Sequence, residues 1–335
     1  MRIVLIGDIH AFRLMHAPWD LAGKAIAGQT NVWLRRRRVF DLRLMVPVTE
    51  RIEQLQPDLI LLSGDLTSIA SRREFEHVAT FLKPLRDRYR VIGIPGNHDR
   101  YTFTAMLTRR MERVFPGLVP AVFPDLRPLT DRWKLLCIDS AVPRVVNSRG
   151  RVGPRQLRKV REIFAAADPL DGLLILCHYT LGKLPGLPES PRSHRLEDEE
   201  ELLNILAECP SRVIFVHGHV HRPWLWHRLE PLLSHVVDLN AGAPCQVGSE
   251  FPFGQGFWEI NLVSPSARAD GVTFIHHIPQ PPKQVSPESG YVSSAPLPPI
   301  MWDAVPVEPI GGRADSTGVE STWDFGGQIT IRSGR

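Results

Sequence analysis

The chain has 335 residues, and its hydrophobic content of 43% is enough for one large domain or two modest ones with a real core. The formal net charge is only +4, from 40 basic and 36 acidic residues, which permits an anionic substrate but does not require nucleic acid. The four cysteines lie far apart and form no C-x-x-C pair, which argues against a disulfide framework and favours a reducing compartment.

Five short apolar runs predict buried strands, and each is followed by residues that bind metals. In chain order they are MRIVLIG before Asp8 and His10, DLILLSG before Asp65, RVIGIPG before Asn97 and His98, GLLILC before His178, and RVIFVHG before His219 and His221. The ligand crevice of an open α/β sheet lies just beyond the carboxyl ends of its strands. We therefore expect these side chains to converge. If the last run continues as a strand, its two final histidines face the same side.

Helical patterns and further strands alternate along the chain. Ser71 and Glu74 form a capping-box pattern that opens a helix over 72–88, and Pro154 begins a helix that runs to about Ala167. The acidic segment 196–208 predicts a third helix. Other strands are expected at 133–139, 173–178 and 212–216. The later segments 235–242, 256–263 and 271–278 predict a meander that finishes a second sheet.

The composition changes after about residue 279, where PQPPKQVSPESGYVSSAPLPPI is rich in proline and serine. Such a segment buries little apolar surface, so it predicts a flexible or extended tail. We therefore expect one enzymatic domain over 1–278 and a tail over 279–335.

A basic and aromatic insertion at 18–46 follows the first predicted strand, so it should lie at the rim of the crevice. The run from Arg35 to Arg38, with Trp19, Trp33 and Phe40, could bind a phosphorylated headgroup or a membrane surface. We hypothesise a lid that selects a bulky, lipid-linked phosphoester. The alternative is a solvated helix face with its tryptophans in the core.

Neither a membrane span nor a secretory signal is visible in the sequence. No apolar stretch approaches the roughly 20 residues that cross a bilayer. The N-terminal residues lack the basic region, long apolar stretch and cleavage site of a signal peptide. We therefore expect a cytoplasmic protein, at most peripheral to a membrane through residues 18–46. The sequence does not give its oligomeric state.

The residue types that follow the strands predict a two-metal hydrolytic centre. Two divalent ions clamp a phosphoryl group and supply a hydroxide for in-line attack. They need a bridging carboxylate, hard oxygen ligands and neutral imidazoles. One ion would be held by Asp8, His10, Asp65 and His221, and the other by Asp65, Asn97, His178 and His219. Mixed nitrogen and oxygen ligands suit Mn, Fe, Zn or Co, so the sequence does not specify the metal.

The charge of such a centre favours a phosphoester substrate. Two divalent ions, two aspartates and a bridging hydroxide together leave a charge of about +1, which attracts a phosphate ester. His98 is next to Asn97 but is not needed as a ligand. It is placed to protonate the leaving alkoxide or to stabilise the phosphoryl oxygens.

The ordered set D-x-H, G-D, G-N-H-D, a lone histidine and G-H-x-H, spread over residues 7–221, resembles the calcineurin-like metallophosphoesterase superfamily. The segment from Leu239 to Gly242 resembles the N-x-G element that often follows these motifs. The resemblance implies a four-layer α-β-β-α sandwich of two mixed β-sheets, with a dimetal site at one end. It also implies the same seven metal ligands, with His98 as the catalytic histidine.

Finer resemblances bear on the substrate. The chain departs from the G-D-x-x-D-R-G and G-N-H-E patterns of the serine/threonine protein phosphatases. The segment CIDSAVPRVVNSRGRVGPRQL resembles bacterial cyclic-nucleotide phosphodiesterase-like members. This implies a dimetal phosphodiesterase acting on a small, nucleotide-type ester, with no specific nucleic-acid binding. The alternatives are a lipid-precursor pyrophosphohydrolase resembling the UDP-2,3-diacylglucosamine enzymes and an inactive binding scaffold of the same fold.

Overall fold

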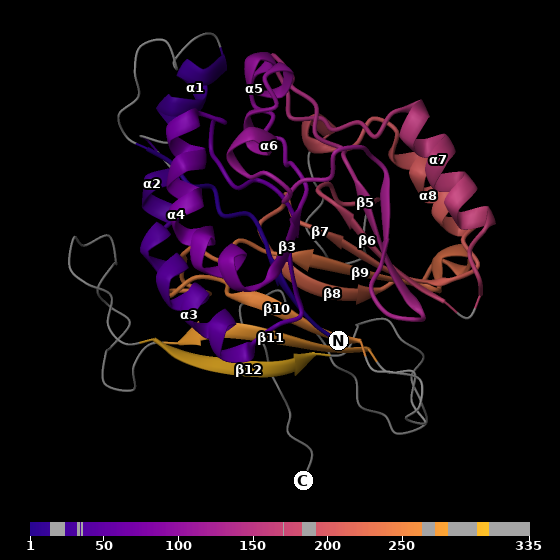
Figure 1. Cartoon of the computed structure of the whole chain (residues 1–335). Helices are drawn as coiled ribbons and strands as arrows, with labels where there is room; N and C mark the ends of the chain where they lie inside the picture. Colours follow the sequence, from indigo (N-terminus) through magenta and orange to yellow (C-terminus); the bar gives the residue numbers. More distant parts are fainter. Residues whose placement is uncertain are drawn as a thin grey trace.

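Two six-stranded sheets lie face to face in the part of the chain that the structure describes (Figure 1). The structure is a computed structural model, and it describes residues 1–13, 24–31, 34, 36–169, 171–182, 192–262, 272–280 and 300–307. The strands are β1 (Arg2–Ile6), β2 (Leu59–Leu62), β3 (Arg90–Gly93), β4 (Asp125–Pro128), β5 (Trp133–Ile138), β6 (Gly172–Cys177), β7 (Arg212–His217), β8 (Pro223–His227), β9 (Val236–Ala241), β10 (Phe257–Leu262), β11 (Val272–Gln280) and β12 (Met301–Val307).

Helices and short 3-10 turns connect these strands. They are α1 (Lys24–Asn31), α2 (Arg37–Val39), η3 (Leu42–Leu44), α3 (Met45–Leu55), α4 (Arg72–Arg88), α5 (Phe103–Leu107), α6 (Arg110–Val114), α7 (Pro154–Ala165), η4 (Arg192–His194), α8 (Glu199–Ala207) and η5 (Pro231–Leu233). Within the described ranges, no helix is both long and apolar enough to span a bilayer.

Each sheet has a parallel centre and antiparallel strands beside it. The first sheet has the order β12-β11-β10-β1-β2-β3, in which β1, β2 and β3 are parallel and β10 runs antiparallel to β1. The second has the order β4-β5-β6-β7-β9-β8, in which β5, β6, β7 and β9 are parallel. The parallel strands of each sheet therefore place their carboxyl ends along one edge.

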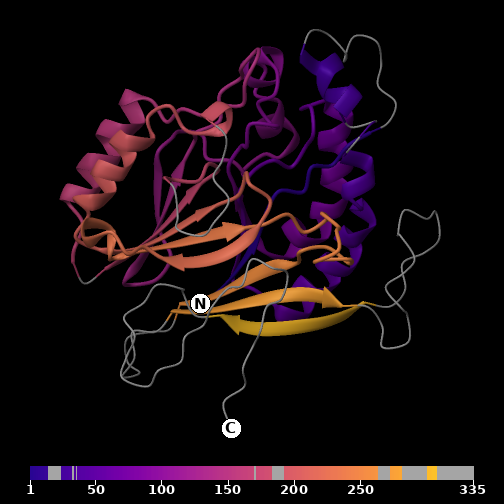
Figure 2. The same ribbon diagram turned by 180° about the vertical axis from the view of Figure 1, so that it is seen from behind.

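The alternation of side chains along the strands produces four layers. In β1, Ile3 and Leu5 pack against the second sheet, whereas Val4 and Ile6 pack against the helices that cover the first. Helices α3 and α4 cover the outer face of β1 and β2, and α7 and α8 cover the outer face of the second sheet (Figures 1 and 2). The four-layer α-β-β-α sandwich of two mixed sheets is thus confirmed.

The helices expected from sequence patterns are present. Ser71 and Glu74 form the expected capping box at α4, since the Ser71 hydroxyl accepts from Glu74 N at 3.2 Å and the Glu74 carboxylate accepts from Ser71 N at 3.1 Å. Helix α7 begins at Pro154 and ends two residues before the expected Ala167. Helix α8 occupies the centre of the acidic segment. All four cysteines are free and buried, in keeping with the absence of a disulfide framework.

Two expectations about the later strands are wrong. The segments at 235–242, 256–263 and 271–278 do form strands, but not one meander, because β9 lies in the second sheet while β10 and β11 pair with β1 in the first. In addition, residues 279–280 and 301–307 belong to the paired strands β11 and β12 rather than to a flexible tail. Pro306 is tolerated there because β12 is the edge strand. The rest of 279–335 lies outside the described residues, apart from Ile300.

Candidate metal centre

The residues expected at the site converge at the carboxyl ends of five parallel strands. Asp8 and His10 follow β1, Asp65 follows β2, and Asn97 and His98 follow β3. In the second sheet, His178 follows β6, and His219 and His221 follow β7. Both sheets therefore contribute to one site. The seven proposed ligand residues fall into two neighbouring groups that share Asp65, as described below.

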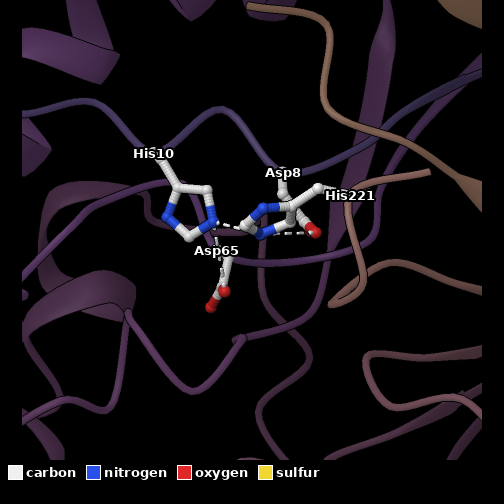
Figure 3. A group of neighbouring side chains, drawn as sticks. All are labelled: Asp8, His10, Asp65 and His221. Carbon is white, nitrogen blue, oxygen red and sulfur yellow. Dashed lines mark hydrogen bonds and ion pairs between the residues drawn. The ribbon is translucent and has the colours of Figure 1, made fainter. Parts of the chain in front are cut away.

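The first donor group consists of Asp8, His10, Asp65 and His221, whose donor atoms all lie within 4.8 Å of one another (Figure 3). The Nε2 atoms of His10 and His221 are 2.7 Å apart. His10 Nε2 is 3.5 Å from Asp65 Oδ2, and His221 Nε2 is 3.5 Å from Asp8 Oδ2. Two imidazole nitrogens and two carboxylates thus surround one point.

The second donor group consists of Asp65, His178, His219 and Asn97. The donor atoms of the first three lie within 4.8 Å of one another. The Asn97 Oδ1 atom is 3.1 Å from His178 Nε2 and 2.9 Å from His219 Nδ1. His178 Nε2 is also 3.4 Å from Asp65 Oδ2. The amide oxygen therefore belongs to the same cluster.

Two carboxylate oxygens at the centre of the cluster fit a divalent cation. Asp65 Oδ2 and Asp8 Oδ1 are buried and have no hydrogen-bond partner among the described residues. A buried carboxylate oxygen without a partner is costly, and a cation is the usual compensation. Asp65 Oδ2 lies between His10 Nε2 and His178 Nε2, where one oxygen can serve both groups. Carboxylate oxygens with imidazole nitrogens are also the donor types of Mn, Fe, Zn and Co sites.

Backbone carbonyls orient three of the histidine rings. His178 Nδ1 is 2.8 Å from Ser63 O, His219 Nε2 is 2.8 Å from His194 O, and His98 Nδ1 is 2.6 Å from Ser68 O. Each ring donates one N–H to a carbonyl, which fixes the tautomer and turns the other nitrogen inward. This is the arrangement that metal-binding histidines usually have.

The backbone at the site adopts left-handed conformations that side chains rarely favour. His10, Asp65, His219 and His221 have φ values of 49°, 51°, 72° and 51°. Such strain is concentrated at functional sites, where the surrounding structure compensates for it. The strand that would place His219 and His221 on one face does not extend to them, because β7 ends at His217 and both lie in the following loop.

Glycine is required where the loops meet the carboxylates. A Cβ atom at Gly96 would overlap Asp65 Oδ1, and one at Gly218 would overlap Asp8 Oδ1. Only a residue without a side chain allows these close approaches.

Asp99 and Asn240 hold the loops in place. Asp99 accepts hydrogen bonds from Gly96 N, Leu66 N and Thr67 N at 3.0–3.2 Å, and so joins the loops after β2 and β3. Asn240 donates to Gly218 O at 2.8 Å and accepts from Gly242 N. The sequence motifs contain both residues, but their bracing contacts are visible only in the structure.

Burial and mutual interaction shift the pKa values of the site residues. Burial raises the pKa of Asp8 well above its usual range, although His178 opposes the shift. Burial also acts on Asp65, but the histidines, His178 foremost, outweigh it and hold the pKa of Asp65 well below its usual range. Burial alone would lower the pKa of His178, yet the carboxylates of Asp65 and Asp8 bring it to about 9. The two shifts have one cause, which is the close approach of the Asp65 carboxylate to the His178 ring.

Arg36 is a site residue that sequence reasoning did not single out. Its guanidinium nitrogens lie 2.7 Å from His10 Nδ1 and 2.7 Å from His98 Nε2. Phe40 packs edge-on against His10 and His221, with ring centroids 5.1 and 5.7 Å apart. The run of four arginines at the expected rim was the available signal, but it did not show which arginine turns inward. Arg35, Trp19 and Trp33 lie outside the described residues.

Comparisons with known proteins agree with this geometry. A family profile described as calcineurin-like phosphoesterase matches residues 1–223, more than half of the chain. The 3',5'-cyclic adenosine monophosphate phosphodiesterase CpdA of Haemophilus influenzae is 25% identical over 209 residues, which cover 62% of this chain and 71% of that protein. A probable cyclic nucleotide phosphodiesterase of Vesicomyosocius okutanii is 24% identical over 186 residues, which cover 54% of this chain and 70% of that protein.

A likeness among solved structures supports the fold. The structure of PhoD matches with a TM-score of 0.55 and 10% identity, covering 91% of this chain and 68% of that chain. Sequence profile, relatives and architecture therefore agree. The chain belongs to the calcineurin-like phosphoesterase family and is a metal-dependent phosphoester hydrolase.

Proposed function

We propose that the protein is a two-metal phosphodiesterase that hydrolyses a small, nucleotide-type phosphodiester. The observation that carries this proposal is the position of Asp65 Oδ2, which is buried, has no hydrogen-bond partner among the described residues, and lies between the two donor groups. We assign the first ion to Asp8, His10, Asp65 and His221, and the second to Asp65, Asn97, His178 and His219. Such a pair of ions supplies a hydroxide nucleophile at neutral pH and neutralises phosphoryl charge.

The protein's own residues prepare this site in several ways. Carbonyl contacts hold the His178 and His219 rings, so these side chains need to move little when a metal ion binds. The Asp65 carboxylate is held by His98 N, which donates to its Oδ1 at 2.7 Å and leaves Oδ2 directed at the cluster. We assign His98 as the catalytic histidine, placed beside the phosphoryl group by its bond to Ser68 O.

The substrate class rests on the relatives. The two relatives described above are named as cyclic nucleotide phosphodiesterases, at 24–25% identity. We therefore propose a nucleotide-type phosphodiester and leave the choice of nucleotide to the assay.

The test combines metal analysis with a substrate screen. The purified protein should contain about two transition-metal ions per chain, and chelation should abolish hydrolysis of bis(p-nitrophenyl) phosphate until Mn²⁺ is restored. Asn97→Ala or His98→Ala should reduce turnover at least about 10²-fold, which is the usual contribution of such residues. The screen then compares cyclic nucleotides, phospholipid diesters and nucleotide-lipid pyrophosphates.

Three outcomes would contradict the proposal. A protein with well under two metals per chain and no metal-stimulated hydrolysis would be a binding scaffold. Unchanged turnover in both variants would reject the roles of Asn97 and His98. A preference for nucleotide-lipid pyrophosphates over cyclic nucleotides would replace the proposed substrate class by the lipid-precursor alternative.

A further inference from the structure

Arg36 belongs to a run of four arginines, yet its guanidinium lies at the candidate metal centre. One guanidinium nitrogen is 2.7 Å from His10 Nδ1 and 3.4 Å from Ser68 Oγ, and the other is 2.7 Å from His98 Nε2. The two neighbours that follow it, Arg37 and Arg38, are exposed. Arg36 alone among these three bridges a proposed metal ligand and the proposed catalytic histidine.

The segment that carries Arg36 is fastened to the body of the protein. Phe40 is buried against the rings of His10 and His221 and bridges to Gln246. Asp41 N donates to Cys245 O at 2.8 Å, and Val247 N donates to Val39 O at 2.8 Å. These contacts begin three residues after Arg36. The guanidinium is therefore delivered to the site by a backbone that is fixed nearby.

Hydrogen-bond chemistry defines the state of the rings that Arg36 contacts. A guanidinium only donates, so both ring nitrogens beside it must accept. His98 satisfies this requirement because its other nitrogen donates to Ser68 O. For a neutral His10, the hydrogen must then be on Nε2, where it can be donated to His221 Nε2 at 2.7 Å.

With its hydrogen on Nε2, His10 cannot bind a metal through that nitrogen. A neutral imidazole that binds a metal through Nε2 keeps its hydrogen on Nδ1. That hydrogen would face the N–H of Arg36, donor against donor. The contact between Arg36 and His10 must therefore break when His10 becomes a ligand. One edge of a charged guanidinium is then left free beside the phosphoryl site.

We propose that Arg36 is a phosphoryl-binding residue that is held by His10 in the metal-free protein and released by metal binding. The inference rests on the proposed function, because it takes His10 as a metal ligand. A guanidinium fork matches two phosphoryl oxygens and forms charge-assisted hydrogen bonds with them. The guanidinium nitrogen freed from His10 contacts a phosphoryl oxygen. Arg36 thus opposes metal binding and favours phosphate binding.

The test measures both effects by calorimetry, with Mn²⁺ alone and then with inorganic phosphate added to the Mn²⁺-loaded protein. Arg36→Gln should bind Mn²⁺ up to about tenfold more tightly at the first donor group, because no contact has to be broken. The same variant should bind phosphate about 10- to 100-fold more weakly. The phosphate affinity of Arg36→Lys should lie between those of Arg36→Gln and the native protein. Arg37→Gln and Arg38→Gln, at exposed neighbouring positions, should change neither affinity by more than about twofold.

A spectroscopic readout reports the ring directly. In the metal-free protein, histidine ¹⁵N–¹H spectra should show His10 with its hydrogen on Nε2, and Zn²⁺ should move that hydrogen to Nδ1. In Arg36→Gln, the metal-free preference for the Nε2 form should weaken. His10→Gln identifies the signal, and circular dichroism shows whether each variant is folded.

The outcomes separate the two proposals. If the native protein binds no Mn²⁺, the proposed function and this inference both fail. If it binds two ions and hydrolyses phosphodiesters but Arg36→Gln binds phosphate as well as the native protein does, only the role of Arg36 is overturned. Weaker Mn²⁺ binding by Arg36→Gln would likewise reject the release of Arg36 by metal.

Discussion

The two donor groups of the site lie in different surroundings. In the second group, the rings of His178 and His219 are each held by a backbone carbonyl, and Asn97 joins them. In the first group, His10 has a guanidinium where a carbonyl is expected, and the segment from Arg36 to Phe40 lies against it. One half therefore has its rings oriented in advance by carbonyls, whereas a guanidinium lies against a ring of the other. The difference predicts unequal metal affinity.

The largest effect should come from the residue that the two halves share. Asp65→Asn keeps an oxygen that can accept from His98 N, but it removes the charge that serves both groups. We expect the loss of both ions and a fall in turnover of about 10³-fold. Plasma mass spectrometry and hydrolysis of bis(p-nitrophenyl) phosphate measure these quantities. A folded variant that retains two ions would show that Asp65 is not shared.

Substitutions in one half at a time sharpen the comparison. His221→Gln removes a donor of the first group, and His219→Gln removes a donor of the second. Each variant should retain about one ion per chain and lose about 10²-fold in turnover. Because the second group is arranged in advance, the ion left in His221→Gln should be held more tightly than the ion left in His219→Gln. Competition with a fluorescent chelator measures both affinities, and equal values would remove the proposed asymmetry.

Substitution of Asp99 tests how much the loops after β2 and β3 depend on its hydrogen bonds. Asp99→Ala leaves the N–H groups of Gly96, Leu66 and Thr67 without their acceptor. We expect the free energy of unfolding to fall by about 2–4 kcal/mol in urea titrations. The control is Asp87→Ala, whose carboxylate forms an exposed ion pair with Lys83 and should change stability by less than about 1 kcal/mol. Similar effects for the two variants would mean that Asp99 does not brace the loops.

The smallest effect concerns Glu74, which is buried at the start of α4. Burial raises the pKa of Glu74 to about 7, from an ordinary value near 4.5, despite its hydrogen bonds from Ile69 N and Ser71 N. The folded protein thus binds this proton more tightly than the unfolded chain does. The contribution of this bound proton to stability is fully present below pH 4.5. It decreases as the pH rises above 4.5 and is lost once the pH has passed through 7.

Between pH 6 and 8 this loss amounts to about 1 kcal/mol. Glu74→Gln keeps an acceptor for the capping box and removes the titration. The difference in unfolding free energy between the native protein and this variant should therefore change by that amount across the interval. If this difference does not change with pH, any pH dependence of stability in this range comes from groups other than Glu74.

Much of the fold and the geometry of the cluster could be predicted from the sequence because both depend on local patterns. Apolar runs that end at Gly64 or Gly96 define a strand followed by a tight loop, and parallel strands bring their ends together. The sequence alone thus places Asp65 and Asn97 in one region. Their side chains do meet the same histidine, His178.

The remainder depends on contacts that no local pattern encodes. The runs containing β10 and β11 indicate strands, but their partners are chosen by the packing of the whole sheet. The left-handed backbone at His219 depends on loop contacts, so an alternating pattern suggested a strand instead. Arg36 has the same side chain as Arg37 and Arg38. Only the folded path of the insertion decides which of them reaches His10.

The pairing of β1 with β10 has a consequence for the order of folding. Arg2 lies opposite Asn261, so the strand that leads directly into Asp8 and His10 is completed on one side by residues synthesised much later. On the ribosome, the first strand must wait with an unpaired edge until the distant segment emerges. Contacts of such long sequence separation form slowly. A chain halted before β10 should therefore need chaperones to protect that edge, although every proposed ligand has already been translated.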